Sequence, residues 1–324
     1  MTQSAPDELF LSSAEEHLRD ALKKFSTKQE KVAFLQEFHH RLANDDWDWI
    51  ADIVERRPYG AVDIKTFIED PEYLNMKGVL YPVVMNEITE MNSGRYVEAV
   101  CTGAIGTGKT TIALITTAYQ LYLLAQYDSP QKKFGLDPAS EIVFIFQSIN
   151  AKLAKSVDYD RFKTMIDRSP WFQRNFMYDK NLESELKFPH RVIVKPVSGA
   201  ETGAIGQNVI GGVIDELNFM AVVEDSKHSK DGGTYDQAVA LYNSISRRRK
   251  SRFMKQGVMP GVLCLVSSVR YPGQFTDTKI AESKAEIERQ GYTSIFVYNK
   301  TTWDIKPPGT FTGDWFNVFT GDST

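Results

Sequence analysis

The sequence predicts an α/β fold in which a mainly parallel sheet is covered by helices on both faces. Three observations carry this prediction. Strands and helices alternate from about residue 80 onward, and a glycine-rich loop at 103–110 stands between a predicted strand and a predicted helix. A third observation is an apolar strand at 208–214 that ends in two acidic residues, as strands often do where a parallel sheet carries its site.

The first sixty residues predict a small helical appendage. Thr27–Glu30 has the spacing of a helix-capping box, and apolar residues follow it at helical intervals. A second short helix is predicted over 47–57. His39 and His40 are adjacent, so they point to different faces of the first helix, and we expect them on a solvated surface rather than at a metal.

The rest of the chain predicts six strands and one long helix over 111–127, directly after the glycine-rich loop. Continuous apolar runs at 142–146 and 262–266 are typical of parallel strands buried on both faces. We therefore expect one α/β domain over 61–306, preceded by the appendage of 1–60 and followed by a tail or linker over 307–324. The six predicted strands are 96–102, 141–147, 191–197, 208–214, 261–267 and 293–299.

Composition limits the classes of function. The chain has 324 residues, of which 42% are hydrophobic and 25% are charged, and its net charge of −4 excludes a globally basic nucleic-acid binder. Any contact with DNA must come from a local patch. Cys101 and Cys264 fall in predicted interior strands, so we expect buried free thiols. No apolar run has the length of a membrane span and no signal peptide opens the chain, so we expect a cytosolic protein.

The glycine-rich loop matches the phosphate-binding pattern G-x-x-x-x-G-K-[ST] without a gap. Its backbone N–H groups would surround phosphate oxygens, helped by the N-terminus of the helix that Thr111 continues. Lys109 would reach the β- and γ-phosphates, and the Thr110 hydroxyl would bind Mg²⁺. A chance glycine-rich turn is the alternative, which the strand–loop–helix context disfavours. The eight residues are Gly103, Ala104, Ile105, Gly106, Thr107, Gly108, Lys109 and Thr110.

The apolar strand before Asp215 and Glu216 predicts the second half of an ATPase site. Asp215 would hold Mg²⁺ through a water molecule, and Glu216 would orient and deprotonate the water that attacks the γ-phosphate. The alternative is a helix cap or a surface turn. Because a kinase has no use for an activated water, Glu216 favours hydrolysis. The 299–302 segment lacks the acidic residue of a guanine-binding pattern, so ATP is the expected nucleotide.

Ser267 and Ser268 end the next apolar strand, where strand ends meet at the nucleotide. Small hydroxyl residues at this place can sense the γ-phosphate and relay its loss to parts that move. An ordinary turn at the end of a strand explains the same two residues equally well. The pattern alone leaves both readings open.

With these segments in this order, the chain resembles the ATPase domain of the large terminase subunit, the DNA-packaging motor of tailed double-stranded DNA phages. The resemblance covers about residues 60 to 305 and rests on the phosphate loop, the acidic strand end, Ser267-Ser268 and the 302–307 stretch. Tyr81-Pro82 is also similar to the lead-in of the family, where the adenine is bound.

The resemblance implies an ATPase that assembles as a ring on the phage portal protein and pushes double-stranded DNA into the procapsid. It implies ATP and Mg²⁺ as cofactors, the small terminase subunit as a partner, and the cytoplasm of the bacterial host as the location. Lys109, Thr110, Asp215 and Glu216 take the phosphate, metal and water roles in this reading. A helicase-like DNA-dependent ATPase and a nucleotide-gated scaffold without turnover are the alternatives.

Three departures from the family concern the arginines and the length. Neither the phosphate loop nor the 199–204 segment contains the arginine that many large terminases use for catalysis. The basic run 247–252 offers Arg248 as a candidate arginine finger, with DNA phosphate contacts and a solvated face as alternatives. About fifty residues follow Ser268, too few for the nuclease domain of the family, so we expect no nuclease domain within this chain: either it is an ATPase alone or the nuclease is elsewhere.

Overall fold

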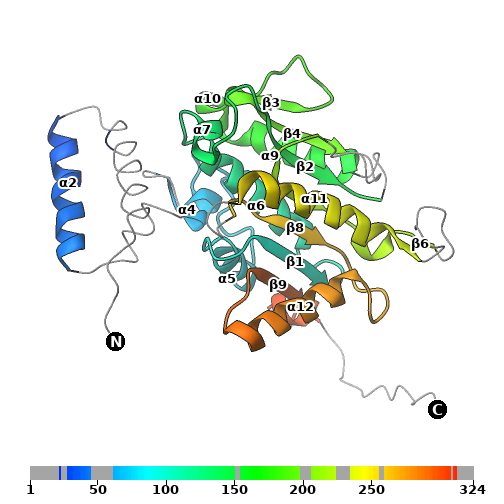
Figure 1. Cartoon of the computed structure of the whole chain (residues 1–324). Coiled ribbons are helices and arrows are strands. Elements are labelled where there is room, and N and C mark those ends of the chain that lie inside the picture. The colour runs from blue at the N-terminus through cyan, green and yellow to red at the C-terminus, as the bar shows by residue number, and fades with distance from the viewer. Residues whose placement is uncertain are drawn as a thin grey trace, which may run out of the picture.

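A seven-stranded sheet in the order β3-β4-β2-β5-β8-β1-β9 forms the centre of the protein (Figure 1). The computed structural model describes residues 22, 28–44, 61–149, 154–197, 206–223, 234–254, 259–307 and 309–311. Six strands run parallel to their neighbours in the sheet, and β3 adds to one edge in the antiparallel sense. The α/β fold with a mainly parallel sheet is therefore confirmed, and it is that of a RecA-like P-loop domain.

All six predicted strands are present, and none of their ends differs from the prediction by more than two residues. Sequence reasoning missed β3 (Leu186–Phe188) and the separate two-stranded pair of β6 (Val222–Val223) and β7 (Tyr235–Asp236), because two or three residues are too few to show a period. The confirmed strands are β1 (Glu98–Gly103), β2 (Ile142–Gln147), β4 (Val192–Val197), β5 (Val209–Ile214), β8 (Leu263–Val266) and β9 (Ile295–Lys300).

Helix α6 (Lys109–Leu124) lies at the centre of the larger core, between the sheet and several shorter helices. Because it has neighbours on most sides, twelve of its residues are buried, although a surface helix would bury only one stripe. Alternate side chains of β2, such as Phe144 and Phe146, point into this core. The helices around α6 are α4 (Ile64–Glu69), α5 (Pro82–Met91), α9 (Asp160–Arg168) and α10 (Pro170–Asn175).

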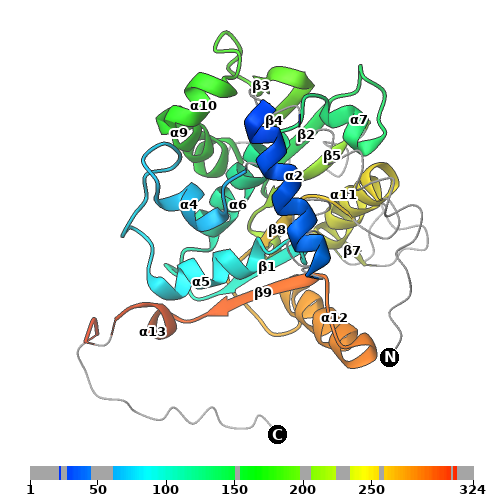
Figure 2. The ribbon, with the colours of Figure 1, turned by 90° about the vertical axis from the view of Figure 1, so that its left-hand side faces the viewer.

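The opposite face of the sheet is covered by α11 (Gln237–Phe253) and α12 (Phe275–Gln290). Leu241 and Ile245 of α11 belong to the same apolar cluster as Val143 and Ile145, the alternate residues of β2 that face away from α6. Figures 1 and 2 show these helices on one side of the sheet and the α4–α10 group on the other. The molecule is therefore a three-layer α/β/α domain.

The N-terminal appendage is represented by α2 (Lys28–Ala43), which confirms the first predicted helix. Its His39 and His40 are exposed, as expected for a solvated surface. The second predicted helix over 47–57 and most of the predicted tail lie outside the described residues. Two further short helices are α7 (Pro130–Phe134) and α13 (Thr302–Ile305). Among the described helices, none combines the length and apolar composition needed to cross a membrane.

Strand β8 separates the strand of the phosphate loop, β1, from the strand of the acidic pair, β5. The two cysteines, Cys101 in β1 and Cys264 in β8, are buried and free, as predicted. The carboxyl ends of β1, β8 and β5 therefore lie side by side at one edge of the sheet.

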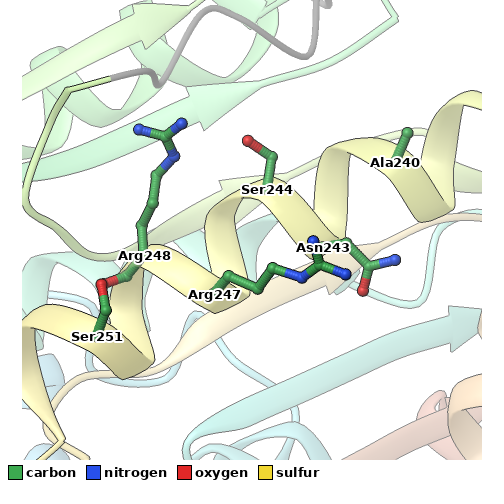
Figure 3. Close-up of a pocket in the computed structure, with 6 residues that line it drawn as sticks. All are labelled: Ala240, Asn243, Ser244, Arg247, Arg248 and Ser251. Atoms are coloured by element: carbon green, nitrogen blue, oxygen red, sulfur yellow. The ribbon is translucent and has the colours of Figure 1, made fainter.

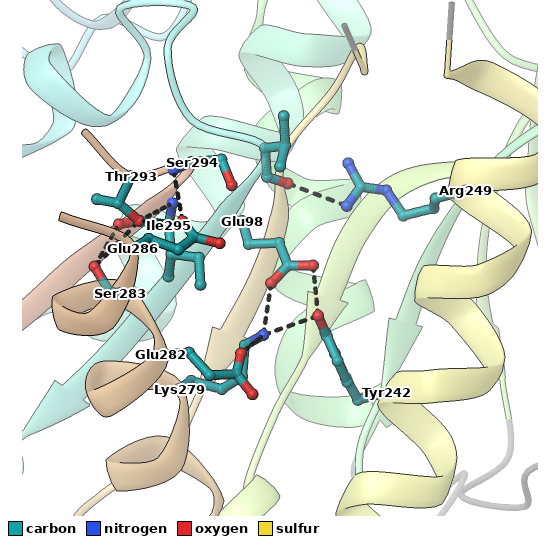
Figure 4. Close-up of polar contacts among 11 residues, drawn as sticks. Glu98, Tyr242, Arg249, Lys279, Glu282, Ser283, Glu286, Thr293, Ser294 and Ile295 are labelled. Atoms are coloured by element: carbon teal, nitrogen blue, oxygen red, sulfur yellow. Dashed lines mark hydrogen bonds and ion pairs between the residues drawn. The ribbon is translucent and has the colours of Figure 1, made fainter. Parts of the chain in front are cut away.

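One side chain, Arg249 of α11, connects the amino-terminal ends of these three strands. It is fully buried and its guanidinium donates hydrogen bonds to four main-chain carbonyls, one of which is drawn in Figure 4. Nε bonds the oxygen of Ile210 at 3.0 Å and Nη1 that of Val97 at 3.1 Å, while Nη2 bonds those of Gly261 at 3.0 Å and Pro260 at 3.4 Å. These carbonyls lie at the amino-terminal ends of β5, β1 and β8.

A buried ion pair continues this layer between β1 and α12 (Figure 4). Lys279 Nζ lies 3.1 Å from Oε2 of Glu98 and donates to the Tyr242 hydroxyl at 2.8 Å. The same hydroxyl donates to Oε1 of Glu98 at 2.7 Å. Burial acts against the charge of Lys279, but Glu98 and Glu282 raise its pKa above the ordinary value. Helices α11 and α12 therefore both contact the start of β1, the strand that leads to the phosphate loop.

Replacing Arg249 by alanine should lower the free energy of unfolding by about 3–5 kcal/mol, because several buried carbonyls lose their donor at once. Urea unfolding of Arg249→Ala measures this loss. Arg252→Ala, at an exposed position of the same helix, is the matched control and should change the free energy by less than about 0.5 kcal/mol. Equal stability of the two variants would contradict the role given to Arg249.

Candidate nucleotide-binding site

The phosphate loop begins where β1 meets the end of β9. Gly103 has a φ of +100°, and a Cβ at this position would lie 2.4 Å from the carbonyl oxygen of Lys300. No other residue fits so close to a neighbouring backbone. Gly106 and Gly108 also have positive φ values, of +78° and +84°, but a Cβ there would meet open space. Close packing therefore requires glycine at position 103, whereas the positive φ of the loop favours glycine at positions 106 and 108.

Hydrogen bonds hold the loop in shape. The Thr107 hydroxyl donates to the carbonyl of Ala104 at 2.9 Å, and the Tyr298 hydroxyl of β9 donates to the carbonyl of Thr107 at 2.6 Å. Both of these side chains are buried, whereas Ile105 at the tip of the loop is 83% exposed. The base of the loop is therefore held by buried hydrogen bonds, and its tip faces solvent.

Lys109 is the first residue of α6, and its ammonium group turns back over the loop. Nζ donates to the carbonyl of Ala104 at 2.6 Å and lies 3.3 Å from that of Gly103. Burial lowers the pKa of Lys109, while Glu216 and Asp215 act in the opposite direction. The two carbonyl oxygens accept the hydrogen bonds that the Lys109 ammonium group would otherwise donate to phosphate oxygens. Thr110 and Thr111 follow in the first helical turn, where main-chain N–H groups have no partner within the helix.

The acidic pair leaves the end of β5 in a strained turn. The Asp215 amide donates to the carbonyl of Gln147 at 2.7 Å, which continues the sheet by one residue. Glu216 then adopts a left-handed conformation, with φ of 58° and ψ of 34°, and its amide donates to Oδ1 of Asp215 at 2.9 Å. Such a conformation is uncommon for a residue with a side chain and is concentrated at functional sites.

Lys109, Asp215 and Glu216 meet at the carboxyl edge of the sheet, as the sequence predicts. Burial raises the pKa of Asp215 and so does the charge of Glu216, whereas Lys109 lowers it. Burial likewise raises the pKa of Glu216, and Lys109 opposes this. A single ammonium group thus faces two carboxylates that are partly removed from water.

The oxygen donors at this edge suit Mg²⁺, which prefers hydroxyl, carboxylate and phosphate oxygens. Thr110 and Asp215 are the predicted ligands, and the burial of Asp215 beside Glu216 leaves negative charge that a divalent cation would offset. The described residues hold no group of three or more His, Cys, Asp or Glu side chains able to bind a metal by themselves. Mg²⁺ would therefore need the phosphates of a nucleotide as well.

Asn218 connects the acidic pair with the predicted coupling segment, and sequence reasoning missed it. Its amide N–H donates to Oγ of Ser267 at 3.0 Å, and its Nδ2 donates to the carbonyl of Ser268 at 3.0 Å. Nδ2 also donates to Oγ1 of Thr276 at 2.8 Å, and Oδ1 accepts from the Thr276 amide at 3.2 Å. The segment two residues after Glu216 is therefore joined to the end of β8 and to the start of α12.

Two further residues reach the site from the segment after β2. Asp158 belongs to a π-helical turn (Ala154–Tyr159), and Arg161 belongs to the following α9. Nη2 of Arg161 donates to Oγ1 of Thr111 at 3.3 Å. Burial raises the pKa of Asp158, and the charge of Asp215 raises it further, whereas Arg161 lowers it. No sequence motif marks either residue, because a single charge in a polar stretch is usually solvated.

The basic run of α11 lies away from this edge. Arg249 binds the amino-terminal ends of the strands, so it is a structural residue, and its inclusion among the candidate fingers is wrong. Arg248, the preceding residue, is partly buried and lines a hollow with Arg247 (Figure 3). Because the phosphate loop lies at the carboxyl edge, Arg248 does not reach the site of its own subunit. The other residues lining the hollow are Ala240, Asn243, Ser244 and Ser251.

Tyr81 lies at the start of α5, and its side chain is 40% exposed. Glu87 of the same helix forms a 2.7 Å ion pair with Lys300, the residue whose backbone lies against Gly103. Helix α5 is thereby fastened to the strand end beside the phosphate loop. A contact of Tyr81 with the adenine stays a prediction.

Comparison with known families agrees with this architecture. Residues 22–317 match a family described as "Uncharacterized protein MJ0330, N-terminal P-loop domain". The chain belongs to this family of P-loop domains. The P-loop class that the glycine-rich motif predicts is therefore confirmed. A comparison with curated proteins finds no match.

The structure is also similar to three solved structures. The large terminase from a thermophilic bacteriophage, in complex with ATP-γ-S, is 11% identical with a TM-score of 0.42 over 70% of this chain and 46% of that one. The HK97 bacteriophage large terminase is 14% identical with a TM-score of 0.45 over 73% and 43%. The N-terminal domain of the DNA packaging ATPase from bacteriophage phi29 is 12% identical with a TM-score of 0.37 over 67% and 96%. The matched regions thus span less than half of each of the two large terminases.

Proposed function

We propose that this P-loop domain binds ATP with Mg²⁺ and hydrolyses the ATP, and that it acts as the ATPase of a large terminase subunit, moving double-stranded DNA into a phage procapsid. The observation that carries the ATPase proposal is the meeting of Lys109, Asp215 and Glu216 at one edge of the sheet. The packaging role is supported by the order of the sequence motifs and by the coupling segment Ser267-Ser268.

Lys109 binds the β- and γ-phosphates in this proposal by exchanging the carbonyls of Gly103 and Ala104 for phosphate oxygens. The exchange keeps a buried ammonium group hydrogen-bonded in both states, which limits its cost. Thr110 and Asp215 would hold Mg²⁺, which neutralises charge on the phosphate oxygens when it is bound. The N–H groups of the loop and of the first turn of α6 bind the remaining phosphate oxygens.

Glu216 acts as the general base in this proposal. Its left-handed backbone turns the side chain out of the path of β5, and partial burial raises its pKa, which strengthens it as a proton acceptor. It orients the attacking water and accepts its proton as the oxygen bonds to the γ-phosphorus and the ADP oxygen leaves. Lys109 stabilises the negative charge on the transferred group.

Coupling follows from the bonds of Asn218. Loss of the γ-phosphate releases the water and the contacts that hold Glu216, and Asn218 transmits the change to Ser267 and Thr276. Thr276 lies in the first turn of α12, and Gln274 just before this helix donates to the carbonyl of Asn218 at 2.8 Å. Movement of α12 would then be the output of the hydrolysis step.

The assembled motor is a homo-oligomeric ring on the portal protein, served by the small terminase subunit in the cytoplasm of the bacterial host. Arg248 lies away from the site of its own subunit, so a role as a finger requires that it reach the site of a neighbour in the ring. An adjacent subunit would thus complete each site, as arginine fingers do in other P-loop enzymes. Tyr81 would contact the adenine.

Steady-state ATP hydrolysis with and without double-stranded DNA tests the proposed function. A packaging ATPase should hydrolyse ATP slowly alone and faster with double-stranded DNA and portal-bearing procapsids. Stimulation by single-stranded DNA together with strand separation would favour a helicase-like enzyme. Nucleotide binding with no turnover under any condition would favour a nucleotide-gated scaffold.

Glu216→Gln should abolish hydrolysis while leaving ATP affinity within about twofold of the wild type, because the amide keeps the shape but cannot accept the proton. Turnover by a coupled phosphate-release assay and affinity by a fluorescent ATP analogue measure the two effects. Glu288→Gln on the exposed face of α12 is the control and should hydrolyse ATP at the wild-type rate. Normal turnover by Glu216→Gln would remove the general base from this proposal.

Arg248→Ala should lower turnover of the assembled ring by at least about 10³-fold while the monomer keeps its ATP affinity. Mixing it with Glu216→Gln protein should restore part of the activity, because each subunit supplies the group that its neighbour lacks. Arg252→Ala, at an exposed position on the same helix, is the control for a general loss of charge. If Arg248→Ala and Arg252→Ala behave alike, no finger lies at this position.

A further inference from the structure

Asp158 is a buried carboxylate that none of the nucleotide-binding motifs contains. It lies in the π-helical turn Ala154–Tyr159 after β2 and is 1% exposed. Neither of its carboxylate oxygens has a hydrogen-bond donor among the residues that the structure describes. π-helical turns are rare and occur preferentially at functional sites, because the extra residue redirects a side chain.

The charged groups that act on Asp158 all belong to the nucleotide site. They are the carboxylates of Asp215 and Glu216 and the guanidinium of Arg161, which contacts Thr111 in the first turn of α6. Ionised carboxylates are acceptors only, so Asp158 and Asp215 cannot bond to each other without a shared proton. The carboxyl group of Asp158 thus lies close enough to that of Asp215, the predicted metal ligand, for the two to interact.

Burying a carboxylate without a donor or counter-ion is unfavourable, and a second carboxylate beside it adds repulsion. Three carboxylates, Asp158, Asp215 and Glu216, share this edge with the cations of Lys109 and Arg161. A divalent cation that binds between Asp158 and Asp215 would remove both unfavourable effects. Magnesium sites formed with nucleotides commonly use one or two carboxylates together with phosphate oxygens.

We propose that Asp158 is a further ligand of the Mg²⁺ that enters with the nucleotide, bound to it directly or through one water molecule. Asp158 would then approach the cation from the β2 side, while Asp215 and Thr110 approach it from β5 and α6. The inference rests on the proposed function, because it requires that the chain bind a nucleotide with a divalent cation.

Binding of Mn²⁺ to the complex of the chain with AMP-PNP, followed by the loss of the free Mn²⁺ signal in electron paramagnetic resonance, tests the inference without any turnover. Asp158→Asn should weaken Mn²⁺ binding by about 10–100-fold, as loss of a ligand or its supporting partner does at metal sites. Its affinity for AMP-PNP in EDTA should stay within about twofold of the wild type. Asp160→Asn, two residues away and exposed, is the matched control and should bind Mn²⁺ normally.

Mn²⁺ affinity of Asp158→Asn within twofold of the wild type, with AMP-PNP bound, would overturn the inference. A fall in the thermal unfolding midpoint of metal-free Asp158→Asn would also overturn it, since a carboxylate without a donor should stabilise nothing in the empty site. Failure of the wild type itself to bind AMP-PNP has a different meaning, because it would remove the proposed function together with everything that depends on it.

Discussion

The alignment of β1, β5 and β8 is the constraint on which the site depends. Arg249 fixes the amino-terminal ends of these strands by bonding carbonyls next to or within each of them. Because the strands are only four to six residues long, fixing one end also fixes the level at which the other end stops. Lys109 and Asp215 are thereby brought together at the carboxyl ends of the strands, although 106 positions separate them in the chain.

Charge at the carboxyl edge explains why the site suits a nucleotide that brings a divalent cation. The carboxylates of Asp158, Asp215 and Glu216 exceed the cations of Lys109 and Arg161, and burial raises the pKa of all three acids. A phosphate chain alone would add negative charge to this edge, whereas Mg²⁺ bound to phosphate oxygens offsets it. Metal and nucleotide would therefore bind together.

The sequence predicted the sheet and the loop because both have local signals. Apolar runs mark the buried strands, and Gly103 and Lys109 occur at a fixed spacing. The contributions of Asn218, Asp158 and Arg161 had no such signal, since each depends on which segments the fold brings together. The basic run was predictable as a helix. Which of its arginines is buried, Arg249, depends on tertiary packing, and the local sequence does not contain that information.

The affinity of the chain for ATP in the presence of Mg²⁺ after the Lys109→Ala substitution is the most direct test of the nucleotide site. Loss of a charged hydrogen bond to phosphate should weaken binding by about 10–100-fold, as measured by titration with a fluorescent ATP analogue. Lys65→Ala, at an exposed position of α4, serves as the control and should bind like the wild type. If Lys109→Ala binds ATP as tightly as the control, the phosphates do not lie between the loop and the acidic pair.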